Sequence, residues 1–211
     1  VEELDVPEFT DRELKKVIEQ FVGDIEQIPP MYSALKQNGK RLYELARKGV
    51  EVERKPRPVR IHSIDLVEFD EQTITLDVFC SKGTYIRTLI EDIGKIMGCG
   101  AHVISLRRTQ AGAFMADQLV TLDELEAIRE QGESLDSLLL PSDSALEHLP
   151  VIELDEQLSF YLSRGQAVQV PGAPEEGIMR LYDAQQDRFL GIGEIDGNGM
   201  VAPKRLFIPA N

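Results

Sequence analysis

Residues Cys80–Gly98 read CSKGTYIRTLIEDIGKIMG, and this run passes from the end of a strand pattern into a helix pattern. From Ile86 onward, apolar residues recur every three or four positions, which predicts an amphipathic helix. The apolar face consists of Ile86, Leu89, Ile90, Ile93 and Met97. We predict that Thr84 caps the start of this helix and that Gly98 ends it.

Arg87 lies in the first turn of this predicted helix, with Lys82 just before it. The N-terminal end of a helix is electropositive, so acidic residues are favoured there and a guanidinium is unusual. The ordinary explanation is a surface arginine that pairs with Glu91 at i+4, which contributes only ~0.3–0.5 kcal/mol. The alternative is a cation that awaits a catalytic carboxylate or a phosphate, because such local inconsistencies are typical of functional sites.

The segments around this helix indicate strands and further helices. Two strands are predicted at 58–69 and 72–80, with a turn near Asp70-Glu71, and the second strand alternates cleanly between apolar and polar residues. We predict another strand at 101–108, AHVISLRR. Upstream, Thr10 and Glu13 form a capping box for a helix over 10–22 that Gly23 ends. The chain then reads as a loop until a short helix from about Lys40 to Lys48.

The second part of the chain has a different pattern. Thr121 and Glu124 form a second capping box, which predicts an acidic helix to about Glu130. Residues 138–150 read as a connector. From 151 onward, short strand-like runs alternate with Gly and Pro turns, which predicts a small β-barrel-like domain. These runs are QAVQV, GIMRLYD, RFLGIGEID and VAPKRLF.

Composition narrows the function classes. The chain has 211 residues, a net charge of −14 and 42% apolar residues, which allows a packed core and argues against disorder. Taken alone, the negative charge argues against nucleic acid, because phosphate binding needs cationic surface. The two cysteines form no CxxC pair and no His cluster stands out, so we expect no metal site. No apolar run approaches the ~20 residues that span a membrane.

The charge is unevenly distributed, however. Residues 31–60 carry nine basic and three acidic residues, whereas 119–150 carry one basic and eight acidic residues. A local basic patch can bind a polyanion while the acidic remainder limits non-specific association. Tyr32 and Tyr43 lie in the basic stretch, where aromatic rings suit unpaired bases. A solvated charged loop is an equally acceptable interpretation of this segment.

Other candidate residues have ordinary explanations of similar weight. Tyr85 alone reads as a half-buried aromatic. Lys82-Gly83 is either a plain turn or a glycine-bearing approach to a ligand. Arg107 and Arg108 are either surface charges or phosphate contacts. His102 is a lone histidine, and no Ser/His/Asp arrangement or paired carboxylates stand out.

Several of these stretches, taken in order, resemble a known family. IPPMYSALKQNGKRLYELARKG, CSKGTYIRTLIEDIG and CGAHVISLRR resemble the TruB-type tRNA pseudouridine synthases. The run from YLSRGQAVQV to VAPKRLF resembles the small PUA-type RNA-binding domain that ends bacterial members. The resemblance covers nearly the whole chain at matching spacing. It implies isomerisation of uridine-55 in the tRNA T-loop, by base flipping and an aspartate-dependent mechanism, without cofactor or metal.

The resemblance also implies roles for individual residues. In the family, the arginine of the YIR motif pairs with the catalytic aspartate, which here is Arg87. Tyr85 would help to wall the uracil pocket and Leu106 would pack at the base. A thumb-like insertion over about residues 30–58 would close over the T-loop. The RNA-contact candidates are Tyr32, Lys36, Lys40, Arg41, Arg47, Lys48, Lys82, Arg107 and Arg108.

One family motif is missing. The aspartate belongs to a GxxDPxATG-type motif that occurs nowhere in these 211 residues, and no initiator methionine is present. Asp24 and Asp92, on or near predicted helices, match no catalytic motif. We therefore expect a fragment that is inactive alone. The alternatives are a T-arm-binding module without chemistry and, more remotely, a protein–protein scaffold that uses the acidic helix.

These observations lead to one expected organisation. We predict an α+β fold: a mixed, largely antiparallel sheet with helices over residues 1–148, and a β-rich PUA-like domain over 149–211. The expected partner is tRNA, through its T-arm stem-loop, with no membrane, no metal and no cofactor. We expect a cytoplasmic protein that is a monomer when intact. Two thiols without a secretory signal fit a reducing compartment.

Overall fold

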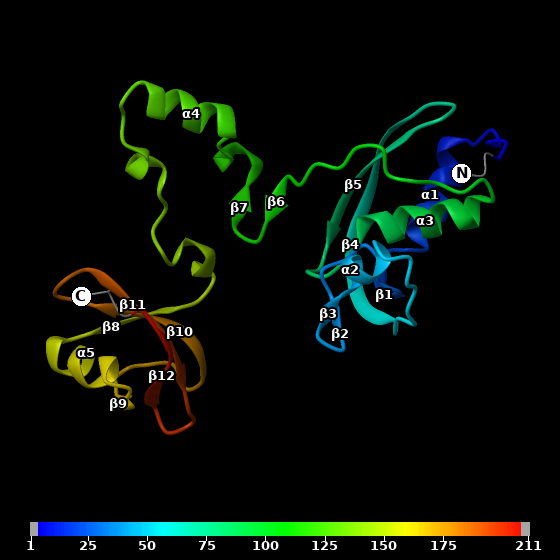
Figure 1. Cartoon of the computed structure of the whole chain (residues 1–211). Coiled ribbons are helices and arrows are strands. Elements are labelled where there is room, and N and C mark those ends of the chain that lie inside the picture. Colours follow the sequence, from blue (N-terminus) through cyan, green and yellow to red (C-terminus); the bar gives the residue numbers. More distant parts are fainter. Residues whose placement is uncertain (1–3, 208–211) are drawn as a thin grey trace. The chain divides into compact units, whose positions relative to one another are not determined.

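The computed structural model describes residues 4–207, which form two compact units that divide in sequence between Leu106 and Arg107 (Figure 1). Both units combine helices with mostly antiparallel sheets, which confirms the predicted α+β class. Each unit has its own buried core and is described by itself. No helix among the described residues is both long and apolar enough to cross a membrane.

The first unit is built on a three-stranded antiparallel sheet in the order β1-β4-β5. The strands are β1 (Gly23–Gln27), β4 (Arg57–Phe69) and β5 (Ile74–Cys80). Two helices, α1 (Asp11–Glu19) and α3 (Ile86–Met97), pack on one face of this sheet. The shared core comprises Phe21, Ile61, Leu89 and Ile93, with Val17, Ile25, Ile64, Leu76, Val78, Cys80, Ile86, Ile90 and Met97 around them.

The apolar stripe of the quoted stretch therefore buries as predicted. All five of its members belong to the core between α3 and the sheet. Gly98 ends the helix in the left-handed conformation, with φ of 83°, as predicted. Thr84 is not the cap, which corrects the prediction: its hydroxyl donates to the carbonyl of Ser81 at 2.9 Å. The N-cap is Tyr85, and its own side chain makes no capping hydrogen bond.

Several boundaries differ from the predictions. Gly23 does not end a helix over 10–22, because α1 ends at Glu19 and Gly23 opens the strand β1. The capping box of Thr10 and Glu13 is present, and it lowers the pKa of Glu13 through the side-chain hydrogen bond with Thr10. Residues 101–108 form no strand, since none of their backbone groups enters a sheet. Arg107 and Arg108 therefore do not end a strand.

The predicted thumb-like region contains more regular structure than expected. A small hairpin precedes a short helix, α2 (Leu42–Ala46). Its two strands, β2 (Lys36–Gln37) and β3 (Lys40–Arg41), have two residues each. The turn residues Asn38 and Gly39 both have positive φ, 51° and 80°. That pair of conformations is the one a tight two-residue hairpin requires, and Asn-Gly is its favoured sequence.

The second unit centres on a five-stranded sheet in the order β8-β10-β11-β12-β9. The four runs expected here correspond to β9 (Val168–Gln169), β10 (Gly177–Asp183), β11 (Arg188–Ile195) and β12 (Met200–Leu206). Two elements were not predicted: β8 (Val151–Leu154), which pairs in parallel with β10, and α5 (Glu156–Ser163). Their residues Leu154 and Leu162 are fully buried in the core of this sheet.

A less regular stretch leads into this sheet. It contains the hairpin β6 (Gln110–Ala111) and β7 (Phe114–Met115), the helix α4 (Leu122–Glu130), and the 3₁₀ turns Ala116–Gln118, Leu135–Leu138 and Ser144–Leu146. The predicted capping box of α4 is present, with the Glu124 amide 3.2 Å from Thr121 Oγ1. The backbone hydrogen bond from Thr121 lowers the pKa of Glu124.

Candidate nucleic-acid interface

The N-terminus of α3 brings Arg87 against the loop that follows β1. Its Nη2 donates a hydrogen bond to the backbone carbonyl of Tyr32, at 2.8 Å. Within residues 4–207, Arg87 is in no ion pair, so the ordinary explanation of a pair with Glu91 is wrong. The guanidinium thus joins two segments that are 55 residues apart, and both of them carry candidate site residues.

Tyr85 is held at the same helix end by a residue that the sequence did not single out. The amide N–H of Tyr85 donates to Oε1 of Gln27 at 3.0 Å, and Nε2 of Gln27 donates to the Tyr85 carbonyl at 3.4 Å. Gln27 is only 2% exposed. The sequence offered no signal for this role, since β1 reads GDIEQ, with one apolar residue and no alternating pattern.

The loop between β1 and β2 is held by its backbone at several points. Arg54 Nη1 donates to the Pro29 carbonyl at 3.2 Å, and the Tyr43 amide donates to the Ser33 carbonyl at 3.1 Å. With the Arg87 bond, these contacts fix the backbone on both sides of Tyr32. The Tyr32 side chain itself is 59% exposed. An aromatic ring on a fixed backbone in open solvent is suited to stacking with an unpaired base.

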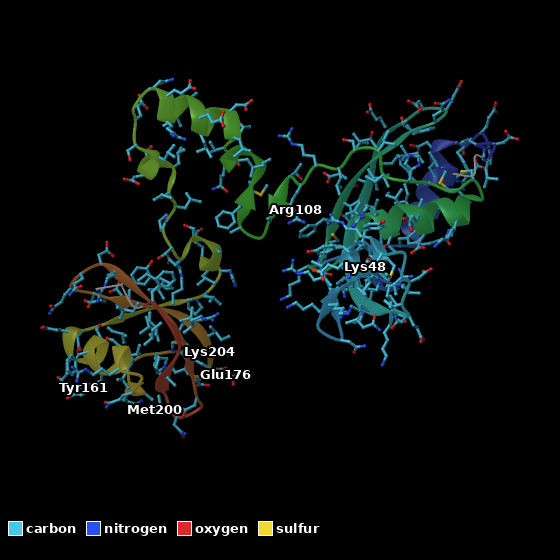
Figure 2. All side chains as sticks on the ribbon, in the orientation of Figure 1. Lys48, Arg108, Tyr161, Glu176, Met200 and Lys204 are labelled. Atoms are coloured by element: carbon cyan, nitrogen blue, oxygen red, sulfur yellow. The ribbon has the colours of Figure 1, made fainter. Side chains whose placement is uncertain are left out.

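The predicted cations Lys36, Lys40, Arg41, Arg47 and Lys48 are all exposed. Lys36, Lys40 and Arg41 lie on the hairpin, where Lys36 is opposite Arg41 in the register. Arg47 and Lys48 directly follow helix α2. Figure 2 labels Lys48 among the side chains of this region. No member of this basic cluster is in an ion pair within the described residues. The cluster therefore leaves cationic charge available to a polyanion.

Tyr43 differs from the expectation of a ring that is free for bases. Arg41 and Arg47 lie over its ring, with guanidinium carbons 5.8 and 5.4 Å from the ring centroid. Arg41 Nη1 also donates to the Tyr43 hydroxyl at 2.8 Å, and this hydrogen bond raises the pKa of Arg41. The ring orients two cations by cation–π contact rather than presenting a stacking face.

The remaining candidates are exposed. Lys82 lies in the turn before α3, next to Gly83 with φ of 88°. Leu106, at the end of the first unit, is 63% exposed. Arg107 and Arg108 belong to the second unit, where Figure 2 labels Arg108. The structure thus brings Tyr32, Tyr85 and Arg87 together, with the basic cluster on the elements that follow the Tyr32 loop.

The two aspartates considered in the sequence have structural partners. Asp24 lies on β1 and pairs with Arg60 at 3.0 Å. Asp92 pairs with Lys95 on α3 at 2.6 Å, and this contact raises the pKa of Lys95. Across residues 4–207 there is no group of three or more His, Cys, Asp or Glu side chains that could hold a metal ion.

Solved structures with the same fold include protein–RNA machinery. A chain in the crystal structure of a Cbf5-Nop10-Gar1 complex aligns with a TM-score of 0.71 at 24% identity, covering 97% of this chain and 64% of that one. A structure of an H/ACA RNP bound to a substrate RNA containing 2'-deoxyuridine aligns with a TM-score of 0.70 at 22% identity, covering 98% and 64%. At these identities the likeness shows the fold.

Curated sequences are much closer. The tRNA pseudouridine synthase B of Pseudomonas aeruginosa (strain UCBPP-PA14) is 52% identical over 196 residues, which are 92% of this chain and 64% of that protein. The protein of the same name from Tolumonas auensis is 48% identical over 207 residues, 94% of this chain and 64% of its own length. The chain therefore spans a little under two thirds of these relatives.

Family sequence models account for nearly every residue. Residues 1–86 match the TruB family pseudouridylate synthase (N terminal domain), and residues 87–147 match the tRNA pseudouridylate synthase B C-terminal domain. Residues 150–207 match Pseudouridine synthase II TruB, C-terminal. Three consecutive models of one family, together with relatives at about half identity, agree with the resemblance of the YIR and IPPMYSALK stretches. The chain belongs to the TruB family of pseudouridylate synthases.

Proposed function

We propose that this chain supplies the RNA-binding surface and the active-site arginine of a tRNA pseudouridine synthase that isomerises uridine-55 in the T-loop. The observation that carries the proposal is the contact of Arg87 with the Tyr32 backbone, beside Tyr85. This arrangement puts an aromatic ring and a cation at one helix end, in the same unit as the basic cluster, no member of which is in an ion pair within residues 4–207. The family's reaction needs those two features at the flipped uridine.

The reaction itself exchanges one bond to the sugar for another. The glycosidic bond to uracil nitrogen breaks, the base turns, and a carbon of the base is joined to the sugar. That carbon then loses its proton and the freed nitrogen gains one, so the product is an isomer of the substrate. No oxidant, metal or cofactor is needed for this exchange. Arg87 would pair with the catalytic carboxylate, and Tyr85 would wall the pocket that receives the flipped base. Leu106 would pack against that base.

The catalytic carboxylate is not assigned to any residue of this chain. The GxxDPxATG-type motif is absent from the 211 residues, and the aspartates that were considered pair with lysine or arginine. The proposal therefore gives this chain substrate binding and the arginine, and leaves the nucleophile to sequence that it does not contain.

The surface for the T-arm follows from the exposed cations. Lys36, Lys40, Arg41, Arg47 and Lys48 would contact phosphates, and Tyr32 would stack in the loop of the RNA. Lys82, Arg107 and Arg108 are further phosphate candidates. Residues 30–58 would act as the thumb-like insertion of a catalytic-domain part over 1–148, and 149–211 as a PUA-like RNA-binding domain. We propose that the intact protein is a cytoplasmic monomer.

A pseudouridine assay tests this function. The chain would be incubated with a T-arm stem-loop RNA, alone and after fusion to an N-terminal segment that carries the GxxDPxATG-type motif. We expect product only from the fusion. Product from the chain alone would show that the assignment of the nucleophile is wrong.

The absence of that motif favours a second function for the chain as it stands: binding of the T-arm without chemistry. A folded fusion that binds the stem-loop but forms no pseudouridine would select this alternative. Loss of binding when the basic cluster is neutralised would support both functions and exclude a scaffold that acts only through the acidic helix α4.

A further inference from the structure

Gln27 is a buried polar residue whose side-chain amide makes both of its hydrogen bonds to the backbone of Tyr85. It is 2% exposed at the end of β1, and both of its polar atoms bond to Tyr85. Only one orientation of the amide fits, because the Tyr85 N–H must meet an acceptor and the Tyr85 carbonyl must meet a donor. An aliphatic side chain there would leave two backbone groups of Tyr85 without these partners.

This pairing serves one of the unpaired N–H groups at the start of α3, that of the N-cap residue, as the N3 side chain of a capping box does. The first N–H groups of a helix have no partners within it, and a side chain at the N-cap usually serves them. The N-cap of α3 is Tyr85, which makes no such bond. Gln27 instead holds the N-cap residue itself, from a different strand, 58 residues away in sequence. The start of α3 is thereby tied to the sheet.

Gln27 and Arg87 connect the start of α3 to the segment that runs from the end of β1 to Tyr32. Gln27 binds the backbone at Tyr85, and two residues further on Arg87 binds the backbone at Tyr32. The segment from 27 to 32 is therefore fastened at both ends to the start of α3. A shift of Tyr85 relative to the sheet would move the backbone of Arg87, and with it the guanidinium that binds the Tyr32 carbonyl.

We propose that Gln27 is a positioning residue that sets where Tyr85 and Arg87 stand relative to the Tyr32 loop. We call the two hydrogen bonds between Gln27 and Tyr85 the brace. The effect of the brace on RNA binding rests on the proposed function, whereas the existence of the brace does not. Gln27 does not touch the substrate in this proposal; it acts through the backbone of Tyr85 and, through Arg87, on Tyr32.

Hydrogen exchange in the unmodified chain tests the brace directly. The N–H of an N-cap residue has no acceptor within its helix, so without Gln27 the Tyr85 amide would exchange at an unprotected rate. We expect the Tyr85 amide of a ¹⁵N-labelled chain to exchange at least about tenfold more slowly than that limit. Exchange at the unprotected rate would overturn the proposal without any substitution.

A substitution then tests the consequence for RNA. Gln27→Met keeps an unbranched side chain of similar length and removes the donor and the acceptor. We expect the Tyr85 amide to lose its protection and the Kd for a T-arm stem-loop to rise about fivefold by fluorescence anisotropy. The matched control is Gln20→Met, directly after α1, whose side-chain amide, among residues 4–207, bonds only to the Lys16 carbonyl of that helix. The control should leave both readouts unchanged.

A double-mutant cycle separates positioning from general stability. If Gln27 acts through Arg87, then Gln27→Met should add less than about twofold to the Kd once Arg87→Ala is present. An equal effect in both backgrounds would show a merely structural role and overturn the proposal. If the unmodified chain binds no stem-loop RNA, the proposed function fails, and the Tyr85 exchange rate still decides whether the brace exists.

Discussion

Asp143 and Arg180 form a largely buried ion pair that fastens the stretch before β8 to the strand β10. Arg180 Nη1 lies 2.8 Å from Asp143 Oδ2, and the Tyr182 hydroxyl donates to the same oxygen at 2.5 Å. Arg180 Nε also donates to the Leu149 carbonyl at 3.1 Å. Asp143 is 3% exposed, so protein partners must satisfy its carboxylate.

Removal of the carboxylate should therefore destabilise the second unit. Asp143→Ala leaves the Arg180 cation without its partner, and such a loss costs about 3 kcal/mol or more when the pair is buried. Urea unfolding followed through the amide signals of β10 would measure the change in the free energy of unfolding. The double variant Asp143→Leu with Arg180→Met removes both charges and should recover part of the loss. If the double variant is as unstable as the single one, the pairing is not the cause.

The same carboxylate predicts a dependence of stability on pH. Burial raises the pKa of Asp143, but the hydrogen bonds from Tyr182 and Arg180 outweigh that effect, and the pKa is lowered overall. A lowered folded-state pKa gives stability that is present above the unfolded-state value of about 3.9 and is lost as the pH falls through the folded-state value. Thermal melts should show β10 weakening below about pH 4. In Asp143→Asn the same acid-dependent loss should be smaller.

Charge removal from the basic cluster should change the salt dependence of RNA binding. In Lys36→Ala, Lys40→Ala and Arg41→Ala combined, the slope of log K against log salt should flatten by about 0.7–0.9 for each phosphate that the variant no longer neutralises. The comparison variant is Lys95→Ala in the same unit, where the lysine is paired with Asp92. It should leave the slope unchanged. A triple variant with the slope of the unmodified chain would remove these residues from the interface.

Gly94 should tolerate no side chain. It lies buried in α3, and a Cβ there would stand 2.2 Å from the backbone nitrogen of Ala101 and 2.4 Å from the carbonyl carbon of Gly100. Those neighbours are backbone atoms, so they cannot turn aside. Gly94→Ala should cost about 1–3 kcal/mol or more in a urea titration of the first unit. Gly197→Ala, where nothing lies within 4 Å, should be close to neutral.

The parts of the fold that could be predicted were those set by local periodicity. The stripe on α3, the alternation on β5 and the capping boxes at Thr10 and Thr121 depend on neighbours in sequence, and all are present. β1 and β8 were missed because each is short and is defined by its pairing with a distant strand. The opposite error occurred at 101–108, where a strand was predicted from the run AHVISLRR but no strand is present.

In the candidate site, too, features set by local sequence could be predicted and those set by distant contacts could not. The chemical oddity of Arg87 was visible in sequence because a cation opens its helix. Its partner could not be predicted, because the contact is to a backbone carbonyl, and every residue offers one. Gln27 was invisible for a related reason: an amide that bonds to main chain leaves no charge pattern and no motif of its own.

The contact between Arg87 and Tyr32 uses one N–H group of the guanidinium and, within residues 4–207, leaves the others available to a second partner. A guanidinium carries five N–H groups in a rigid planar fork. Among the described residues only one Arg87 hydrogen bond is present, from Nη2 to the Tyr32 carbonyl. An incoming carboxylate can then be bound through two parallel N–H groups while the loop stays attached. A lysine at this position has three donors around one point and offers no such fork, so it could serve both partners only by dividing a single ammonium between them.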